Sequence, residues 1–162
     1  MTSPRWLDER EREAWVRLGS LIQLLPAALD TQLRRDSDLT HFEYWVLAML
    51  SEAPDRTLRM TALAERTSAT LSRLSHVVSR MEERGLVERT PCPEDRRATN
   101  ATLTDGGLAK LVETAPGHVE AVRELVFDAL TPEQVDQLTA ITEAMLLRVD
   151  PDATRTGHIR RT

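Results

Sequence analysis

Residues 60–103 constrain the fold more than any other part of the chain, because several short elements follow one another there without a linker. Met60–Arg66 has the spacing of a short helix, and Thr67–Thr70 is a polar break. Leu71–Arg84 is a second amphipathic segment, followed by Gly85, which suits the left-handed residue that ends many helices. A short helix, a turn of three to four residues and a second helix together predict a helix-turn-helix.

The second helix has one apolar face and one face of small polar and basic residues. Its inward positions recur at helical spacing and are Leu74, Val77, Val78 and Met81. The outer face carries no large aliphatic residue, and no acid precedes Glu82. Hydroxyl, imidazole and guanidinium groups bind base edges and phosphates in the major groove, and a helix N-terminus offers free N–H groups to a phosphate. We therefore predict DNA contacts at Thr70, Ser72, Arg73, Ser75, His76, Ser79 and Arg80. An ordinary solvent-exposed face is the alternative.

A hairpin is predicted directly after this helix. Leu86–Thr90 and Thr99–Leu103 are short, rich in β-branched residues and partly alternating, as strands are. The loop between them, Pro91–Ala98, contains two prolines and several charges, so it cannot form part of a core. Its tip carries Arg96 and Arg97, and an arginine-tipped hairpin beside a helix-turn-helix predicts a winged helix-turn-helix. An exposed, ion-paired turn is the alternative.

A long helix is predicted before this region. Pro4–Arg35 carries a continuous aliphatic stripe, with Ser3 as its expected N-cap and Pro26 as an expected kink or break. Thr40 and Glu43 then form a capping box, which predicts the start of the next helix. The stripe on the first helix has more apolar surface than a small domain can cover, so we expect a partner subunit there.

Two more helices are predicted after the hairpin. One follows Thr104 and is expected to bend at Pro116–Gly117, and the other follows a capping box that begins at Thr131. The predicted fold class is therefore mainly α with a small β-hairpin wing, that is, a winged helix-turn-helix with an α-helical dimerisation domain. The expected division is a discontinuous dimerisation domain at 1–36 and 105–150, a DNA-binding domain at 37–104 and a flexible tail at 151–162.

The charge distribution is compatible with DNA although the chain is acidic. The net charge is −5, but residues 59–100 contain eight arginines and six acids, a net of +2, which leaves −7 for the rest. A solvated face with many arginines is the alternative. The sequence shows no signal-peptide layout, no apolar stretch long enough for a membrane helix, and a single cysteine, Cys92. We therefore expect a protein of the reducing cytoplasm, without a disulfide and without a membrane partner.

Five short segments carry a family resemblance through their order and spacing: Leu39–Leu47, Thr61–Ala64, Met81–Arg89, Asp95–Arg97 and Leu103–Gly107. On these segments the chain resembles the MarR family (multiple-antibiotic-resistance regulators) over residues 10–150. The resemblance implies a winged helix-turn-helix homodimer that binds double-stranded DNA at a pseudo-palindromic operator. It also implies that the first helix and the last two helices form the dimerisation domain.

The same resemblance implies roles for the residues at the tip of the wing. Arg97 would enter the minor groove, Asp95 would orient Arg97 through an ion pair, and Arg96 would contact a phosphate or the groove. Many relatives carry an arginine in the middle of the recognition helix, where this chain has His76. The resemblance therefore does not extend to the operator sequence.

A ligand site is the second implication of the resemblance. Relatives place small aromatic or phenolic anions between the dimer domain and the DNA-binding lobe, and Trp15, Trp45 and His118 could border such a site here. Large aromatic residues that simply belong to the core are the alternative. The four histidines are too scattered for a metal site. Cys92 lies near Arg89 in the wing, and redox sensing by an exposed thiol stays open.

Catalytic motifs are missing from the sequence: it has no nucleophile elbow, phosphate loop or paired carboxylates against an apolar wall. We therefore expect neither an enzyme nor a cofactor. The predicted function is that of a sequence-specific DNA-binding transcriptional regulator, a ligand-responsive repressor that acts as a homodimer. The alternative is a helical dimerisation module that no longer binds DNA and acts through protein contacts. The basic tip of the wing favours the first, because a module without DNA binding has no reason to keep it.

Overall fold

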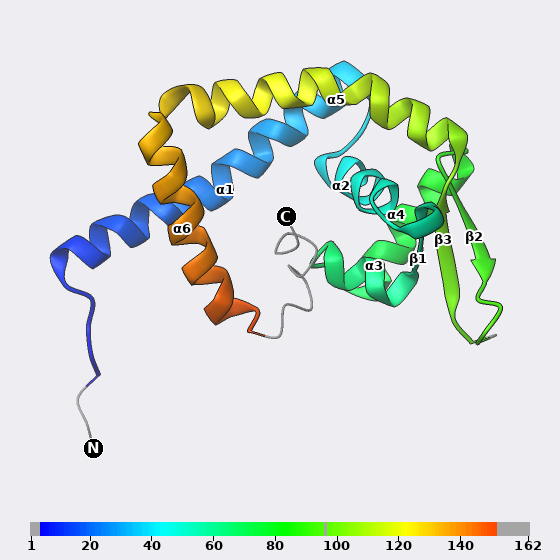
Figure 1. The fold of residues 1–162 in the computed structure, drawn as a ribbon, viewed down its shortest axis with the longest axis horizontal. Helices are drawn as coiled ribbons and strands as arrows, with labels where there is room; N and C mark the ends of the chain where they lie inside the picture. The colour runs from blue at the N-terminus through cyan, green and yellow to red at the C-terminus, as the bar shows by residue number, and fades with distance from the viewer. Residues whose placement is uncertain (1–3, 96, 152–162) are drawn as a thin grey trace.

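The computed structural model describes residues 4–95 and 97–151 and is mostly helical (Figure 1). Its α-helices are α1 (Glu9–Ser37), α2 (His41–Ser51), α3 (Met60–Arg66), α4 (Leu71–Glu83), α5 (Asp105–Leu125) and α6 (Pro132–Val149), with single 3₁₀ turns at Pro54–Arg56 and Phe127–Ala129. Its strands are β1 (Thr57–Arg59), β2 (Val87–Pro91) and β3 (Thr99–Leu103). The predicted fold class, mainly α with a small β wing, is confirmed.

One apolar core holds α2, α3, α4 and the sheet together in a lobe (Figure 1). The predicted inward face of α4 is buried in this core at all four positions, Leu74, Val77, Val78 and Met81. It packs against a set of fully buried aliphatic side chains from α2 and α3: Val46, Leu47, Leu50 and Leu63. Because the apolar face of α4 is buried inside the lobe, the opposite face of the helix is exposed to solvent.

The sheet is antiparallel with the order β1-β3-β2, so β3 lies in the middle. The β2–β3 hairpin was predicted, but β1 was not, because a strand of three residues is too short to show an alternating pattern. A hydrogen bond of 2.8 Å between the hydroxyls of Thr57 and Thr102 joins β1 to β3. This pairing brings Arg59, at the end of β1, next to the wing.

The start of α1 differs from the prediction. Asp8 is the N-cap and forms a capping box with Glu11, with hydrogen bonds of 2.8 and 2.9 Å, so the expected start at Ser3 and Pro4 is wrong. Ser3 itself lies outside the described residues. The reciprocal Asp–Glu cap satisfies two backbone N–H groups, which a proline at the first helical position does not.

Neither proline inside a long helix ends it. α1 continues through Pro26, and α5 continues through Pro116 as one helix that arches over the lobe (Figure 1). A proline removes one backbone hydrogen bond, while the turns on either side keep theirs, so a long helix can continue through it. The expected starts are confirmed at Thr40, Thr104 and Thr131, each of which accepts a backbone hydrogen bond through its side chain.

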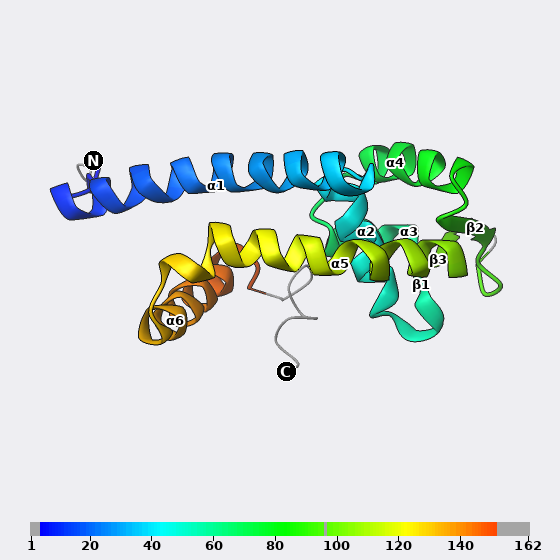
Figure 2. The same ribbon diagram turned by 90° about the horizontal axis from the view of Figure 1, so that it is seen from above.

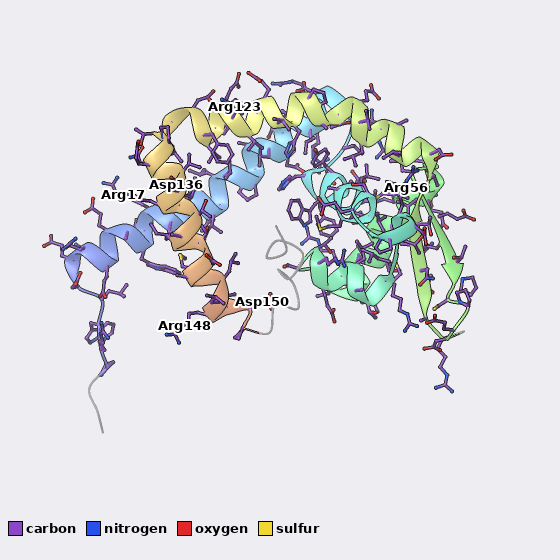
Figure 3. The ribbon with its side chains drawn as sticks, in the orientation of Figure 1. Arg17, Arg56, Arg123, Asp136, Arg148 and Asp150 are labelled. Atoms are coloured by element: carbon purple, nitrogen blue, oxygen red, sulfur yellow. The ribbon has the colours of Figure 1, made fainter. Side chains whose placement is uncertain are left out.

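The N-terminal half of α1 and all of α6 lie outside the lobe (Figure 2). Both carry large apolar side chains that are exposed to solvent. α6 has no buried residue within the described chain. The exposed large apolar side chains of α1, α5 and α6 include Trp15, Leu21, Ile22, Leu24, Val119, Leu125, Ile141, Met145 and Leu147. The same three helices also carry charged side chains, such as Arg17 on α1, Arg123 on α5 and Arg148 on α6 (Figure 3). No helix within residues 4–95 and 97–151 is long and apolar enough to cross a membrane.

Gly107 allows α5 to approach the loop after α4. A Cβ built on Gly107 would collide with the backbone carbonyl of Leu86 and lie 2.7 Å from the Leu103 side chain. The backbone carbonyl cannot move aside without disturbing the turn at Gly85, whose φ is +69°. The close approach of backbone to backbone therefore requires a glycine at position 107.

We expect Gly107→Ala to lower the free energy of unfolding by about 1–3 kcal/mol, because the added methyl overpacks this contact. Gly19→Ala is the matched control, since nothing lies within 4 Å of its Cβ position and alanine favours a helix more than glycine does. Urea unfolding of both variants at one protein concentration measures the difference. If Gly107→Ala is as stable as wild type, the described contact between α5 and Leu86 is wrong.

Candidate nucleic-acid interface

The solvent-facing surface of α4 has a central face and two flanks. Ser72, His76 and Ser79 lie opposite the buried stripe and form the central face, with Ser79 the least exposed of the three. Arg73 and Arg80, seven residues apart and both exposed, lie on the flank next to α2. The other flank faces the wing. The sequence-predicted contacts on α4 therefore share one side of the lobe, which the apolar core leaves open.

The first turn of α2 braces the flank that carries the arginines. The Cζ of Arg73 lies 4.5 Å from the ring centroid of Phe42. At the end of α4, the guanidinium of Arg84 donates to the backbone carbonyl of Asp38 at 2.7 Å and lies 3.6 Å from the Glu43 carboxylate. Two successive residues of α2 thus contact side chains from the two ends of α4.

The opposite flank is tied to the wing by Arg89 of β2. Its guanidinium donates twice to the Glu82 carboxylate, at 2.7 and 2.9 Å, and its backbone N–H donates to the same carboxylate at 2.9 Å. These hydrogen bonds from the backbone and side chain of Arg89 hold the pKa of Glu82 below its ordinary value. The carboxylate stays ionised at neutral pH, so the base of the wing is fixed to the last turns of α4.

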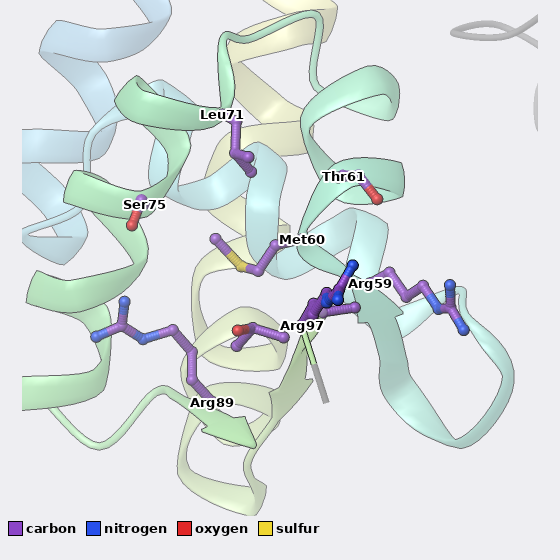
Figure 4. Close-up of a pocket in the computed structure, with 9 residues that line it drawn as sticks. Arg59, Met60, Thr61, Leu71, Ser75, Arg89 and Arg97 are labelled. Carbon is purple, nitrogen blue, oxygen red and sulfur yellow. The ribbon is translucent and has the colours of Figure 1, made fainter. Parts of the chain in front are cut away.

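A cleft of about 210 Å³ lies between α4 and the wing (Figure 4). Leu71 and Ser75 line it from α4, and Arg59, Arg89 and Arg97 line it from the sheet and the wing. Arg59 and Arg89 were not among the predicted contacts. Arg59 pairs with Glu94 at 3.2 Å, across 35 residues of sequence. Both belong to the basic stretch, and Arg89 also ends one of the segments that carry the family resemblance. Neither lies on a helix whose period would reveal its face, so these signals did not mark them as contacts.

The tip of the wing differs from the prediction in two details. The Asp95 carboxylate accepts a hydrogen bond of 3.0 Å from the backbone N–H of Arg97, so it shapes the turn. The expected ion pair between Asp95 and the Arg97 side chain is not found among the residues that the structure describes. The Arg97 side chain is exposed and lines the cleft. Cys92 is buried, so the expected exposed thiol is wrong; its backbone N–H donates to Ala98 across the base of the tip. Arg96 lies outside the described residues.

The three residues predicted to border a ligand site are not brought together within one chain. His118 is buried in α5 and Trp45 is partly exposed on α2. Trp15 is exposed on α1 and lies far from His118 along that helix. It precedes Gln32, the α1 residue next to His118, by seventeen residues, which corresponds to about 26 Å along a helix. The α1 residue that contacts His118 is Gln32, near the end of the helix, with 3.4 Å between its amide oxygen and Nδ1.

A buried polar cluster surrounds His118 at the junction of α1, α2 and α5. The centroid of the His118 ring lies 4.3 Å from that of the Tyr44 ring and 6.0 Å from that of the His41 ring. Burial lowers the pKa of both histidines, and their mutual repulsion lowers that of His118 further, so both rings are neutral at pH 7. The buried hydroxyl of Thr114, one turn before His118, has no hydrogen-bond partner in the described part of the chain. No cluster of His, Cys, Asp or Glu able to hold a metal occurs among the described residues.

Comparisons with known proteins agree with this architecture. Residues 37–98 match a model of the MarR family. Sco3205, a MarR family transcriptional regulator from Streptomyces coelicolor solved in complex with DNA, is 46% identical over 92% of this chain and 93% of its own, with a TM-score of 0.87. AbsC, a MarR family transcriptional regulator from the same organism, is 36% identical over 98% of this chain and all of its own, with a TM-score of 0.79.

A curated relative points the same way. The HTH-type transcriptional repressor IacR of Pseudomonas putida is 32% identical over 117 residues, which are 70% of this chain and 66% of the repressor. The identity to Sco3205 and AbsC extends over nearly the whole of all three chains, so it includes the flanking helices as well as the winged helix-turn-helix. The chain therefore belongs to the MarR family of transcriptional regulators.

Proposed function

We propose that this protein binds a specific operator in double-stranded DNA through α4 and the wing, and represses transcription. The observation that carries the proposal is the division of α4 into a central face of short polar side chains between an arginine flank and the wing. Short donors and acceptors read base edges in the major groove, while guanidinium groups contact phosphates or the minor groove. The crystal structure of the relative Sco3205 in complex with DNA supports DNA as the partner.

Two substitutions should separate sequence recognition from general affinity. We expect His76→Ala to weaken binding to the operator by about 1–3 kcal/mol and to change binding to random DNA little, because His76 lies on the central face. We expect Arg97→Ala to weaken binding to every duplex and to reduce the salt slope by about 1, because its contact is with phosphate or the minor groove. Fluorescence anisotropy over a salt series, with an operator recovered from genomic DNA and a random 30-base-pair duplex, measures both.

The alternative function makes the opposite prediction for the same assay. A dimerisation module without DNA binding would yield no operator from genomic DNA and would change the anisotropy of no duplex at any salt concentration. A His76→Ala variant that loses the same affinity for both duplexes would instead show that the central face is assigned wrongly.

We infer that the protein acts as a homodimer through α1, α5 and α6, which correspond to the expected domain at 1–36 and 105–150. The support is the apolar surface that a single chain leaves exposed on these helices, including Ile22 on α1 and Met145 on α6. Obligate homodimer interfaces bury more than about 2,000 Å², and surface of this kind is their main source of free energy. A dimer also supplies two copies of α4, as a pseudo-palindromic operator requires.

Light scattering at micromolar concentration should give about twice the chain mass of 18.3 kDa. Ile22→Asp should shift the mass toward one chain, because it places a charge in the proposed interface. Gln23→Asp is the matched control and should leave the dimer intact, because Gln23 is exposed and its neighbours one turn away on α1 are Gly19 and Ala27. A monomeric wild-type protein would contradict the inference.

An effector site at the junction of α1, α2 and α5 is the last part of the proposal. Its support is the unpartnered buried hydroxyl of Thr114 beside the neutral His118 and the ring of Tyr44, a setting that suits a small aromatic or phenolic molecule. Such a molecule would change the spacing of the two α4 helices, since α5 connects the junction to the wing. Trp45 is partly exposed on α2, and Trp15 can take part only through the proposed partner subunit.

Thermodynamic linkage gives the test of the effector site. A phenolic compound that releases the operator must bind more weakly, by the same factor, when the operator is present. We expect Thr114→Val to reduce the affinity of that compound in titration calorimetry while operator affinity without the compound is unchanged. Equal affinity of the compound with and without operator would contradict the mechanism.

A further inference from the structure

Phe42 on α2 and Arg73 on α4 form a contact that links two different helices. The guanidinium carbon of Arg73 lies 4.5 Å from the centre of the Phe42 ring, within the range of a cation–π interaction. Phe42 is partly buried and packs against the core of the lobe, so its ring has a fixed position. Arg73 is exposed in the first turn of α4, where a free side chain would sample many rotamers. The ring therefore orders a charged group that solvent would otherwise leave disordered.

The type of contact matters because of the hydrogen-bond donors that it leaves available. A cation–π contact forms no hydrogen bond to an oxygen or nitrogen acceptor, so it leaves the five N–H donors of the guanidinium available for such acceptors. Arg89 donates to Glu82, and Arg84 donates to Asp38, so these guanidinium groups have protein partners. Within residues 4–95 and 97–151, the Arg73 guanidinium has no carboxylate partner in an ion pair and no acceptor in a hydrogen bond. Arg73 is thus held in place with its donors unused.

The position of Arg73 indicates what its donors meet. Arg80 follows seven residues later on the same side of α4, so the two arginines form a row beside the central face. When a helix lies in the major groove with its central face toward the bases, a row along its flank faces a sugar–phosphate strand. A pre-ordered guanidinium loses less rotamer entropy on binding a phosphate than a free one does.

We propose that Phe42 is a positioning residue for DNA binding, which holds the guanidinium of Arg73 against one wall of the groove, where it contacts a backbone phosphate. This inference rests on the proposed docking of α4 in the major groove. Phe42 itself does not touch DNA in this arrangement. Its effect on affinity passes entirely through Arg73, and that property separates it from a residue that only stabilises the lobe.

A double-mutant cycle tests the proposal. Wild type, Phe42→Leu, Arg73→Ala and the double variant are titrated with a duplex selected from a random-sequence library and with an unrelated 30-base-pair duplex, each over a salt series. Phe42→Tyr, which keeps an aromatic face, is the conservative variant. Thermal unfolding of each variant shows the temperature range in which all are folded, and the Kd values are compared within that range.

We expect Phe42→Leu to raise the Kd for both duplexes by about two- to five-fold, the ratio that corresponds to one exposed cation–π contact. Phe42→Tyr should bind as wild type does. Arg73→Ala should reduce the salt slope by about 0.9, one phosphate contact, whereas Phe42→Leu should leave the slope unchanged. In the Arg73→Ala background, Phe42→Leu should have no further effect on the Kd.

Three results would each overturn the inference while leaving the proposed function in place. The first is an equal effect of Phe42→Leu with and without Arg73, because that describes a general loss of packing. The second is wild-type binding by Phe42→Leu, and the third is an unchanged salt slope for Arg73→Ala. If the wild-type protein binds neither duplex, the proposed function itself fails, and this inference fails with it.

Discussion

The capping box at the start of α2 is the interaction on which the arrangement of the molecule depends. Glu43 is almost completely buried, accepts the backbone N–H of Thr40 at 2.7 Å and lies 3.6 Å from Arg84. A buried carboxylate is tolerated only where such partners compensate for its lost hydration. The same turn exposes the backbone N–H of His41, which donates to Asp30 of α1 at 2.8 Å. One turn of helix thus joins α1, α2 and the end of α4.

Charge and hydrogen bonding at this turn reinforce each other. Burial alone would raise the pKa of Asp30, but hydrogen bonds from the Arg34 side chain and from the His41 backbone hold it below its ordinary value. Asp30 therefore stays ionised and keeps both partners at neutral pH. Phe42, in the same turn, contacts Arg73 near the other end of α4. Residues 41–43 therefore contact both α1 and α4, so this turn links the proposed dimer helices to the proposed recognition helix.

Local signals allowed much of the fold to be predicted from the sequence. The side-chain caps at Thr40, Thr104 and Thr131, the left-handed Gly85 and the four-residue apolar stripe of α4 depend on neighbours within a few residues. The candidate contacts on α4 follow from the same short-range periodicity, and their exposure was therefore predictable.

The features that were missed depend on contacts far apart in sequence. β1 forms only because β3, more than forty residues later, supplies its hydrogen-bond partners, and Arg59 reaches the wing through that pairing. Three further features likewise require the folded chain. They are the burial of Cys92, the hydrogen bond from the backbone N–H of Arg97 to Asp95, and the contact between the rings of His118 and Tyr44. The first turn of α1 was misplaced for a different reason: Ser-Pro and Asp-x-x-Glu are both valid start signals, and the reciprocal cap of Asp8 and Glu11 prevails.

Methylation interference on an operator recovered from genomic DNA tests the central claim most directly, because it reports which base edges the bound protein occupies. If two copies of α4 lie in the major groove with their central faces toward the bases, N7 methylation of guanine should block binding in two clusters. The centres of these clusters should be one helical turn apart, about 10–10.5 base pairs, or a multiple of it. N3 methylation of adenine, in the minor groove, should interfere beside the clusters, where the wings lie. Binding that no N7 methylation affects, or a single cluster without a symmetric partner, would contradict the account.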